Sequence, residues 1–148
     1  MTATGAAPTL AGLEVGTEVA RATYPLQRVD LVRYAGASGD FNPIHWSDRV
    51  AGEVGLPGVM AHGMFTLALA GRAVSRWAGG ADRVVELGAR FTRPVMVPDD
   101  EHGAEVVVSG RVLDAMDDLV RIDLTVTCDG TRVLGQARAV VSPHAARA

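Results

Sequence analysis

Residues 62–78 read HGMFTLALAGRAVSRWA, and this stretch determines how the rest of the chain must fold. Apolar side chains recur at intervals of three and four, which is the spacing of one face of an α-helix. Gly79 and Gly80 follow and end the pattern. Because the first half is almost entirely apolar, we expect this helix to be buried on most of its sides. The predicted apolar stripe consists of Met64, Leu67, Ala68, Gly71, Val74, Trp77 and Ala78.

The chain after this helix has the character of β-strands. In the stretch LVRIDLTVTC, the apolar residues Ile122, Leu124, Val126 and Cys128 alternate with polar ones. The Asp-Gly pair that comes next is a strong hairpin signal. Strands with one polar face indicate an antiparallel sheet that is solvated on one side. The predicted strands cover residues 84–95, 105–113, 119–128 and 131–142.

The segment before the helix mixes element types. We expect a strand at 18–25, a helix at 28–35 and a short helical turn at 48–54, with a loose tail at 1–12. A sheet that follows an apolar helix must curl round it to bury it. The sequence therefore predicts an α+β fold, with residues 1–148 forming a single domain in which an antiparallel sheet wraps a central helix.

The composition excludes several classes of function. The chain has 148 residues and a net charge of −3, which gives no electrostatic footprint for nucleic acid. All fourteen basic residues are arginine. Without lysine there is no Schiff-base chemistry and no phosphate-binding P-loop, so we expect no cofactor of those kinds.

The sequence also gives expectations about location. The first basic residue is Arg21, so the start of the chain lacks the charged region of a signal peptide. No apolar run approaches the roughly 20 residues that cross a membrane. Cys128 is the single cysteine, which fits a reducing compartment. We therefore expect a cytoplasmic protein that does not contact a membrane.

The candidate site begins in the loop YAGASGDFNPIHWSD, residues 34–48. Asp40 and His45 lie on either side of Asn42 and Pro43, and the turn can bring both side chains to one point. A carboxylate and an imidazole that share one water molecule form a general acid–base pair. The alternative is an ordinary loop in which Asp40 only caps the next turn of the chain.

A second part of the site is Ala61-His62-Gly63-Met64 at the start of the central helix. Helix starts have unpaired N–H groups and the positive end of the dipole. Because Gly63 has no side chain, a developing enolate oxygen can approach its N–H. We group His62 with Gly63 as a substrate-binding candidate, although a capping or packing role explains His62 equally well.

A metal site is a further alternative. Asp40, His45 and His62 are suitable ligand types. However, the sequence has neither an HxH nor an HExxH spacing. We therefore expect no metal.

The string from Tyr34 to His45, YAGASGDFNPIH, followed by Ala51, resembles the hydratase 2 motif of the MaoC-like dehydratases. Within that group the chain is similar to the HadB-like subunits of 3-hydroxyacyl-ACP dehydratases. The similarity extends over nearly the whole chain and includes TYPLQRVDLVRYAG, GVMAHGMF and RFTRPVMVP. One departure is the acidic turn PDDEHG at 98–103, where many members have Pro-Gly-Asp.

The resemblance implies the hot-dog fold and a hydro-lyase activity in fatty-acid metabolism. The reaction is the reversible dehydration of a (3R)-3-hydroxyacyl thioester to the trans-2-enoyl thioester. By this resemblance Asp40 and His45 hold the water, the Gly63 N–H binds the thioester oxygen, and Asn42 supports the loop. No cofactor or metal is implied.

The resemblance also implies partners. The acyl group is carried by acyl carrier protein or coenzyme A, and the chain forms a homodimer or a heterodimer with a related hot-dog subunit. An acidic carrier would require a basic rim, for which Arg72, Arg76, Arg90 and Arg93 are candidates. Two other functions stay open: a hot-dog thioesterase and a non-catalytic subunit of a dehydratase heterodimer.

Overall fold

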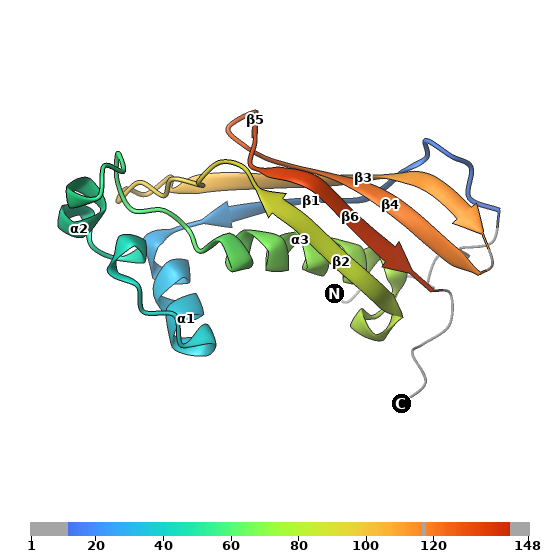
Figure 1. Ribbon diagram of the computed structural model, residues 1–148, viewed down its shortest axis with the longest axis horizontal. Coiled ribbons are helices and arrows are strands. Elements are labelled where there is room, and N and C mark those ends of the chain that lie inside the picture. The colour runs from blue at the N-terminus through green and yellow to red at the C-terminus, as the bar shows by residue number, and fades with distance from the viewer. Residues whose placement is uncertain (1–11, 117, 143–148) are drawn as a thin grey trace.

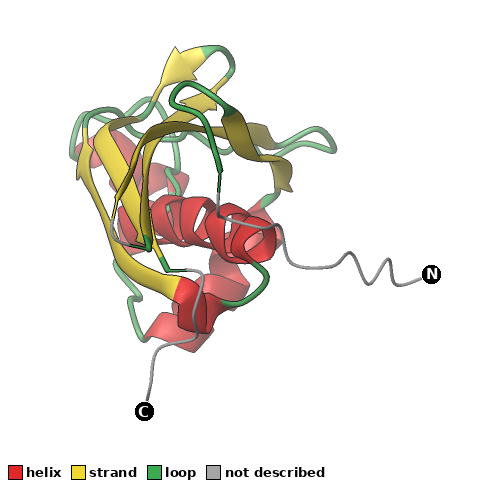
Figure 2. Cartoon of the chain, turned by 90° about the vertical axis from the view of Figure 1, so that its right-hand side faces the viewer, coloured by secondary structure: helices red, strands yellow, loops and turns green. Residues whose placement is uncertain are grey.

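The computed structural model describes residues 12–116 and 118–142, and one antiparallel sheet dominates it. The strand order is β1-β3-β4-β6-β2, with the short β5 paired to β4. The sheet curls around helix α3, which runs along its concave face (Figures 1 and 2). The predicted α+β hot-dog fold is thus confirmed. The elements in chain order are β1 (Glu18–Leu26), α1 (Arg28–Ser38), a 3₁₀ turn (Pro43–His45), α2 (Asp48–Glu53), α3 (Gly63–Ala78), a 3₁₀ turn (Ala81–Arg83), β2 (Val84–Phe91), β3 (Ala104–Met116), β4 (Leu119–Cys128), β5 (Thr131–Arg132) and β6 (Leu134–Val141).

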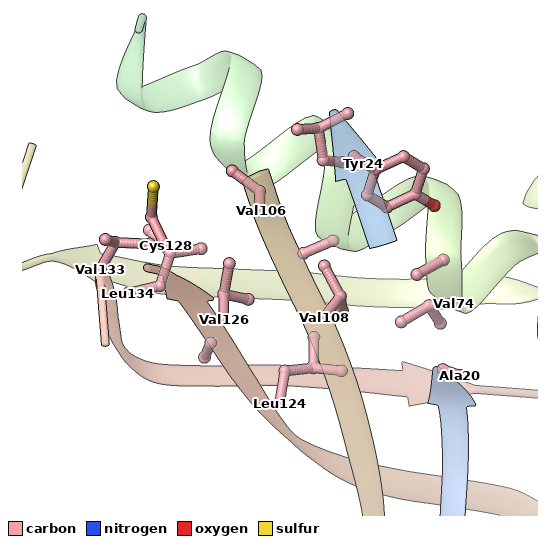
Figure 3. Close-up of a cluster of buried hydrophobic side chains, with 14 of the residues drawn as sticks. Ala20, Tyr24, Val74, Val106, Val108, Leu124, Val126, Cys128, Val133 and Leu134 are labelled. Carbon is pink, nitrogen blue, oxygen red and sulfur yellow. The ribbon is translucent and has the colours of Figure 1, made fainter. Parts of the chain in front are cut away.

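The core lies between α3 and the concave face of the sheet. The alternation predicted for β4 is confirmed, because Ile122, Leu124 and Val126 are fully buried. Figure 3 shows such side chains from β3, β4 and α3 gathered in one cluster. Cys128 belongs to the same buried face, and this burial raises the pKa of its thiol. The protonated thiol is therefore a packing group and a poor nucleophile.

The hairpin after β4 forms at the predicted Asp129-Gly130 pair, where both residues have positive φ angles of 49° and 74°. The return strand predicted at 131–142 is divided, however. It consists of β5 and β6, and a bulge at Gln136, with φ of 47°, shifts the pairing with β2. A bulge adds one residue to one strand, which simple alternation does not reveal.

Helix α3 is buried on fewer sides than its sequence suggests. Met64 is 57% exposed and Ala68 is also exposed. The buried side chains of the helix are Thr66, Leu69, Ala70, Ala73, Val74 and Ala78. Of these, Val74 and Ala78 belong to the predicted stripe, so the buried face is centred on different positions from those predicted.

The segment between β1 and α3 lies at the end of the sheet where α3 begins (Figure 1). Arg28 fixes this segment: it donates two hydrogen bonds to the Asp48 carboxylate, at 3.1 and 2.9 Å, and one to the Val97 carbonyl. Asp48 also accepts from the Val59 N–H at 3.3 Å. The hydrogen bond from Arg28 lowers the pKa of Asp48. These contacts join α1, α2 and the strand-like segment that leads into α3.

The remaining expectations concern the ends of the chain and the membrane. The predicted tail at 1–12 lies outside the described residues, apart from Gly12. Within the described part, no helix is both long enough and apolar enough to cross a bilayer.

Candidate active site

Asp40 is held in place by the turn that ends α1. Gly39 adopts the left-handed conformation, with φ of 76°, and this stops the helix. The Asp40 N–H then donates to Ser38 Oγ at 3.2 Å, and Asp40 Oδ1 accepts from the Asn42 N–H at 3.1 Å. One carboxylate oxygen therefore closes the turn. The other, Oδ2, remains available for chemistry.

His45 is positioned by a short capped turn and by a backbone carbonyl. The Asn42 side chain accepts from the Ile44 N–H at 3.3 Å and so caps the 3₁₀ turn, which begins at Pro43. His45 Nδ1 lies 2.7 Å from the Met60 carbonyl oxygen. A carbonyl can only accept, so Nδ1 carries the proton and Nε2 is free to act. Nε2 lies 3.9 Å from Asp40 Oδ2.

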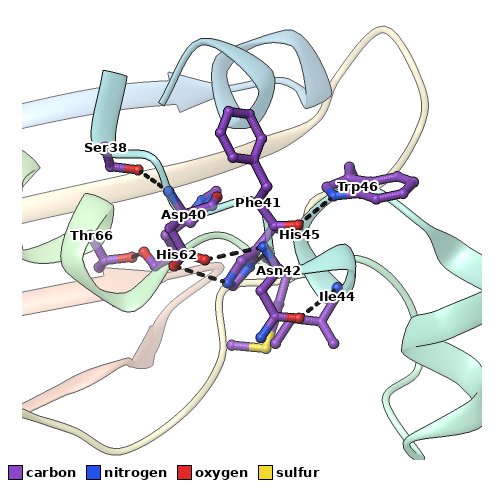
Figure 4. A network of polar contacts seen from close by, with 10 residues as sticks. Ser38, Asp40, Phe41, Asn42, Ile44, His45, Trp46, His62 and Thr66 are labelled. Atoms are coloured by element: carbon purple, nitrogen blue, oxygen red, sulfur yellow. Dashed lines mark hydrogen bonds and ion pairs between the residues drawn. The ribbon is translucent and has the colours of Figure 1, made fainter. Parts of the chain in front are cut away.

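The start of α3 lies directly behind this pair (Figure 4). The imidazole ring of His62 stacks on that of His45, with 3.8 Å between ring centroids and an angle of 24°. His62 Nε2 lies 3.0 Å from the Asp40 carbonyl oxygen. Gly63 is the first helical residue, and its N–H has no acceptor among the described residues. An unpaired donor and the positive helix end thus lie close to Asp40 and His45.

An open, mostly apolar cavity of about 290 Å³ adjoins the site. Met60 and Gly63 line it, and Asp40 and His45 do not. The cavity and the pair therefore share the segment that carries the Met60 carbonyl and the Gly63 N–H. The other lining residues are Leu56, Ala61, Thr66, Phe91, Thr92, Arg93, Pro94, Val95 and Leu134.

The structure brings four of the five predicted site residues into direct contact or sequence adjacency: Asp40, His45, His62 and Gly63. The fifth, Asn42, caps the turn between the pair, and its described side-chain hydrogen bond goes to Ile44. Asp40, His45 and His62 also offer ligand atoms within 4.8 Å of one another. The two imidazole rings are stacked, and His45 Nδ1 and His62 Nε2 each lie within hydrogen-bonding distance of a backbone carbonyl oxygen.

Several contributors were not predictable from residue type. Met60 acts through its backbone carbonyl, which every residue possesses, so no sequence signal marks it. Tyr34 packs its ring 4.9 Å from that of His62.

The predicted basic rim is divided: Arg93 lines the cavity beside Gly63, and Arg76 lines a separate cavity between β1 and α3.

Comparisons with known proteins agree with this arrangement. The family described as "MaoC like domain" matches residues 11–128. The 3-hydroxyacyl-thioester dehydratase X of Mycobacterium tuberculosis is 39% identical over 66 residues, which are 45% of this chain and 22% of that protein. A solved MaoC-like dehydratase superimposes with a TM-score of 0.85 at 34% identity, covering 92% of this chain and 42% of the other. The unliganded R-hydratase PhaJ1 of Pseudomonas aeruginosa gives a TM-score of 0.77 at 29% identity, covering 91% of this chain and 85% of the other.

The extent of these matches differs from one relative to another. The chain spans less than a quarter of the length of the curated relatives that it matches first. The family match, in contrast, extends from before β1 to the end of β4 and includes the loop, the start of α3 and most of the sheet. The chain therefore belongs to the MaoC-like domain family.

Proposed function

We propose that this protein is a hydro-lyase that reversibly dehydrates (3R)-3-hydroxyacyl thioesters to trans-2-enoyl thioesters in fatty-acid metabolism. One observation carries the proposal: Asp40 Oδ2 and His45 Nε2 face each other at 3.9 Å beside the free N–H of Gly63. That distance is too long for a direct hydrogen bond. It fits two acceptors that share one water molecule.

The geometry of such a water follows from the two fixed groups. An oxygen placed about 2.8 Å from each acceptor donates one proton to Asp40 and one to His45. Its lone pairs then point away from both groups and are available for attack on a substrate carbon. Because the tautomer of His45 is set by the Met60 carbonyl, Nε2 faces this position as an acceptor.

In the hydration direction, the water oxygen bonds to C3 of the enoyl thioester. One side chain of the Asp40–His45 pair takes a proton from the water, and a proton is delivered to C2. The π electrons move toward the thioester, so negative charge collects on its carbonyl oxygen before C2 is protonated. The N–H of Gly63 stabilises that charge. Dehydration is the reverse sequence, and either member of the pair can be the group that exchanges the C2 proton.

The substrate class rests on the cavity and on the relatives. The apolar lining around Phe91 and Val95 suits an acyl thioester, and Gly63 places the oxygen donor at its wall. The relative from Mycobacterium tuberculosis is a 3-hydroxyacyl-thioester dehydratase by name, and that from Pseudomonas aeruginosa is an R-hydratase. These names support the reaction and its (3R) stereochemistry for this chain. The similarity to HadB-like subunits favours acyl carrier protein as the carrier, and coenzyme A thioesters are the simpler probe.

The test is an assay of trans-2-enoyl-CoA thioesters of increasing chain length, with loss of the enoyl absorbance and release of free thiol measured in parallel. We expect the absorbance to fall without thiol release. Asp40→Asn and His45→Ala should each lower kcat by about 10²–10⁴-fold, since the two groups act as a unit. Normal turnover in both variants would refute the proposal.

The same assay separates the two alternatives. Thiol release without change at the double bond would identify a thioesterase. No reaction alone, with activity restored by a second hot-dog subunit, would identify a subunit that needs its partner. In the second case, the Asp40→Asn variant in the restored complex shows whether this chain carries the chemistry.

We also propose that the chain dimerises through β2, with itself or with a related hot-dog subunit. Among the described strands, β2 lies at the edge of the sheet and pairs with β6 alone, and it exposes Val85 and Phe91 to solvent at 59% and 53%. Exposed apolar edge strands are templates for pairing with another chain. Light scattering should show a dimer, or a monomer that pairs with an added subunit. Val85→Lys should weaken the association.

A further inference from the structure

His62 contacts both the carboxylate loop and the catalytic imidazole without lining the cavity. Its ring Nε2–H donates to the Asp40 carbonyl oxygen at 3.0 Å, and its ring face stacks on His45 at 3.8 Å. The next residue is Gly63, the proposed oxygen donor. His62 is only 2% exposed. This side chain therefore joins the acid–base pair to the helix start by direct contact.

The second ring nitrogen of His62 shows that the imidazole is not there for packing alone. Because Nε2 donates a proton, Nδ1 of the neutral ring carries a lone pair. Nδ1 is buried and has no hydrogen-bond partner among the described residues. An unsatisfied buried acceptor is unfavourable, and a phenyl ring would fill the same space without that penalty. The polar contact that an imidazole provides, and a phenyl ring does not, is the hydrogen bond to Asp40.

The ring of His62 is prevented from moving by its neighbours. Tyr34 of α1 lies on it at 4.9 Å between centroids, tilted by 56°. Tyr34 in turn stacks on Phe65 of α3, at 4.7 Å and 16°. The backbone carbonyl of His62 accepts the N–H groups of Phe65 and Thr66, which fixes the first turn of the helix. His62 is therefore packed between α1 and the first turn of α3.

We propose that His62 is a positioning residue for the Asp40–His45 pair. Its Nε2–H bond fixes the backbone of Asp40, and its stacked face fixes the plane of His45, so both groups stay in register with the Gly63 N–H. It does not contact the reacting atoms. This role rests on the proposed function, since the geometry that His62 maintains is that of the proposed hydration site.

The test uses three substitutions that separate the two contacts. His62→Gln places an amide donor where Nε2 is, and so keeps the bond to Asp40. His62→Asn carries the same amide one carbon shorter, where it does not reach. His62→Phe keeps the ring and removes the donor. We expect kcat for enoyl-thioester hydration to fall about 10- to 100-fold in the Asn and Phe variants, with KM within about threefold, because small displacements of catalytic groups cost this much. The Gln variant keeps the hydrogen bond but loses the stacked ring, so its kcat should fall by a smaller factor, up to about fivefold below wild type.

A readout that does not depend on activity is the imidazole NMR spectrum of the free protein. In the wild type, His62 should show a slowly exchanging Nε2–H with coupling across the hydrogen bond to the Asp40 carbonyl carbon, and His45 should show the Nδ1–H tautomer. Thermal unfolding of each variant reports whether it folds. Loss of kcat in a variant with an unchanged unfolding midpoint indicates positioning.

Three outcomes would overturn the inference. They are an Asn variant as active as the Gln variant, a Phe variant with wild-type kcat, or an NMR spectrum in which His62 Nε2 carries no proton. Failure of the proposed function gives a different result, because the wild-type protein would then hydrate no enoyl thioester. The NMR spectrum tests the hydrogen bond of His62 in either case, since it does not depend on activity.

Discussion

Gly63→Ala is the substitution that tests the oxygen-donor assignment most directly. A methyl group built on Gly63 would lie 3.0 Å and 3.1 Å from two ring carbons of Phe91. Carbon atoms pack best at about 3.5–4.0 Å, so the ring or the helix start must move by about half an ångström. The methyl group also occupies the surface from which a carbonyl oxygen reaches the N–H. Removing one such donor lowers kcat by about 10²–10³-fold in other enzymes.

We expect Gly63→Ala to lower kcat by about 10- to 100-fold, since the donor is displaced and not deleted. Stability should change little, because the gain in helix propensity of up to about 1 kcal/mol is offset by the displacement of the Phe91 ring. The assay is enoyl-thioester hydration, together with thermal unfolding. Phe91→Leu removes the ring carbons that the new methyl group contacts. Combined with Gly63→Ala, it should therefore restore part of kcat.

Two results would refute this reasoning. If Gly63→Ala keeps kcat within about twofold, the N–H of Gly63 does not stabilise charge in the transition state. If the double variant is no better than the single one, the contact with Phe91 is not the cause of the loss, and the methyl group acts by blocking the approach alone.

The remaining predictions concern stability. Gly103→Ala should lower the free energy of unfolding by about 1–3 kcal/mol, because φ is 63° and the new methyl group would collide with the Leu26 carbonyl oxygen. Chemical denaturation measures this loss. The control is Gly52→Ala, which has open space around it and should change the free energy of unfolding by no more than about 0.5 kcal/mol. The lowered pKa of Asp48 means that its bond to Arg28 contributes stability above pH of about 4, which is lost as the pH falls through the folded-state pKa. Asp48→Asn should therefore make the free energy of unfolding less dependent on pH in that range. An unchanged pH dependence would contradict the role given to this ion pair.

The sequence predicted the framework of the fold because burial patterns and turn residues are local signals. The strand Leu119–Cys128 and the end of α3 at Ala78 are observed where they were predicted. The bulge at Gln136 was not predictable, since it depends on pairing with β2. The exposure of Met64 was missed for a related reason: a helical repeat shows that a helix is apolar, but not how far a sheet extends around it.

The candidate site also combines features that the sequence predicts with contacts that only the folded structure reveals. Asp40, His45 and Gly63 could be proposed from the sequence because the chemistry expected of them belongs to their side chains, or to the lack of one. The two oxygens of the Asp40 carboxylate have different roles, since one closes the turn and the other faces His45. This difference could not be predicted, because the two oxygens are chemically equivalent in the sequence. The stack of His62 on His45 also required the three-dimensional arrangement, since helix α2 and the segment after it separate these two residues in the chain.

Met60 has two separate roles. Its carbonyl oxygen sets the tautomer of His45, and the residue also lines the cavity. A substitution at this position alters the wall and leaves the carbonyl in place. Under the proposed function, a change at residue 60 can therefore alter which acyl groups fit the cavity without disturbing the orientation of His45, so substrate preference can vary independently of the chemistry.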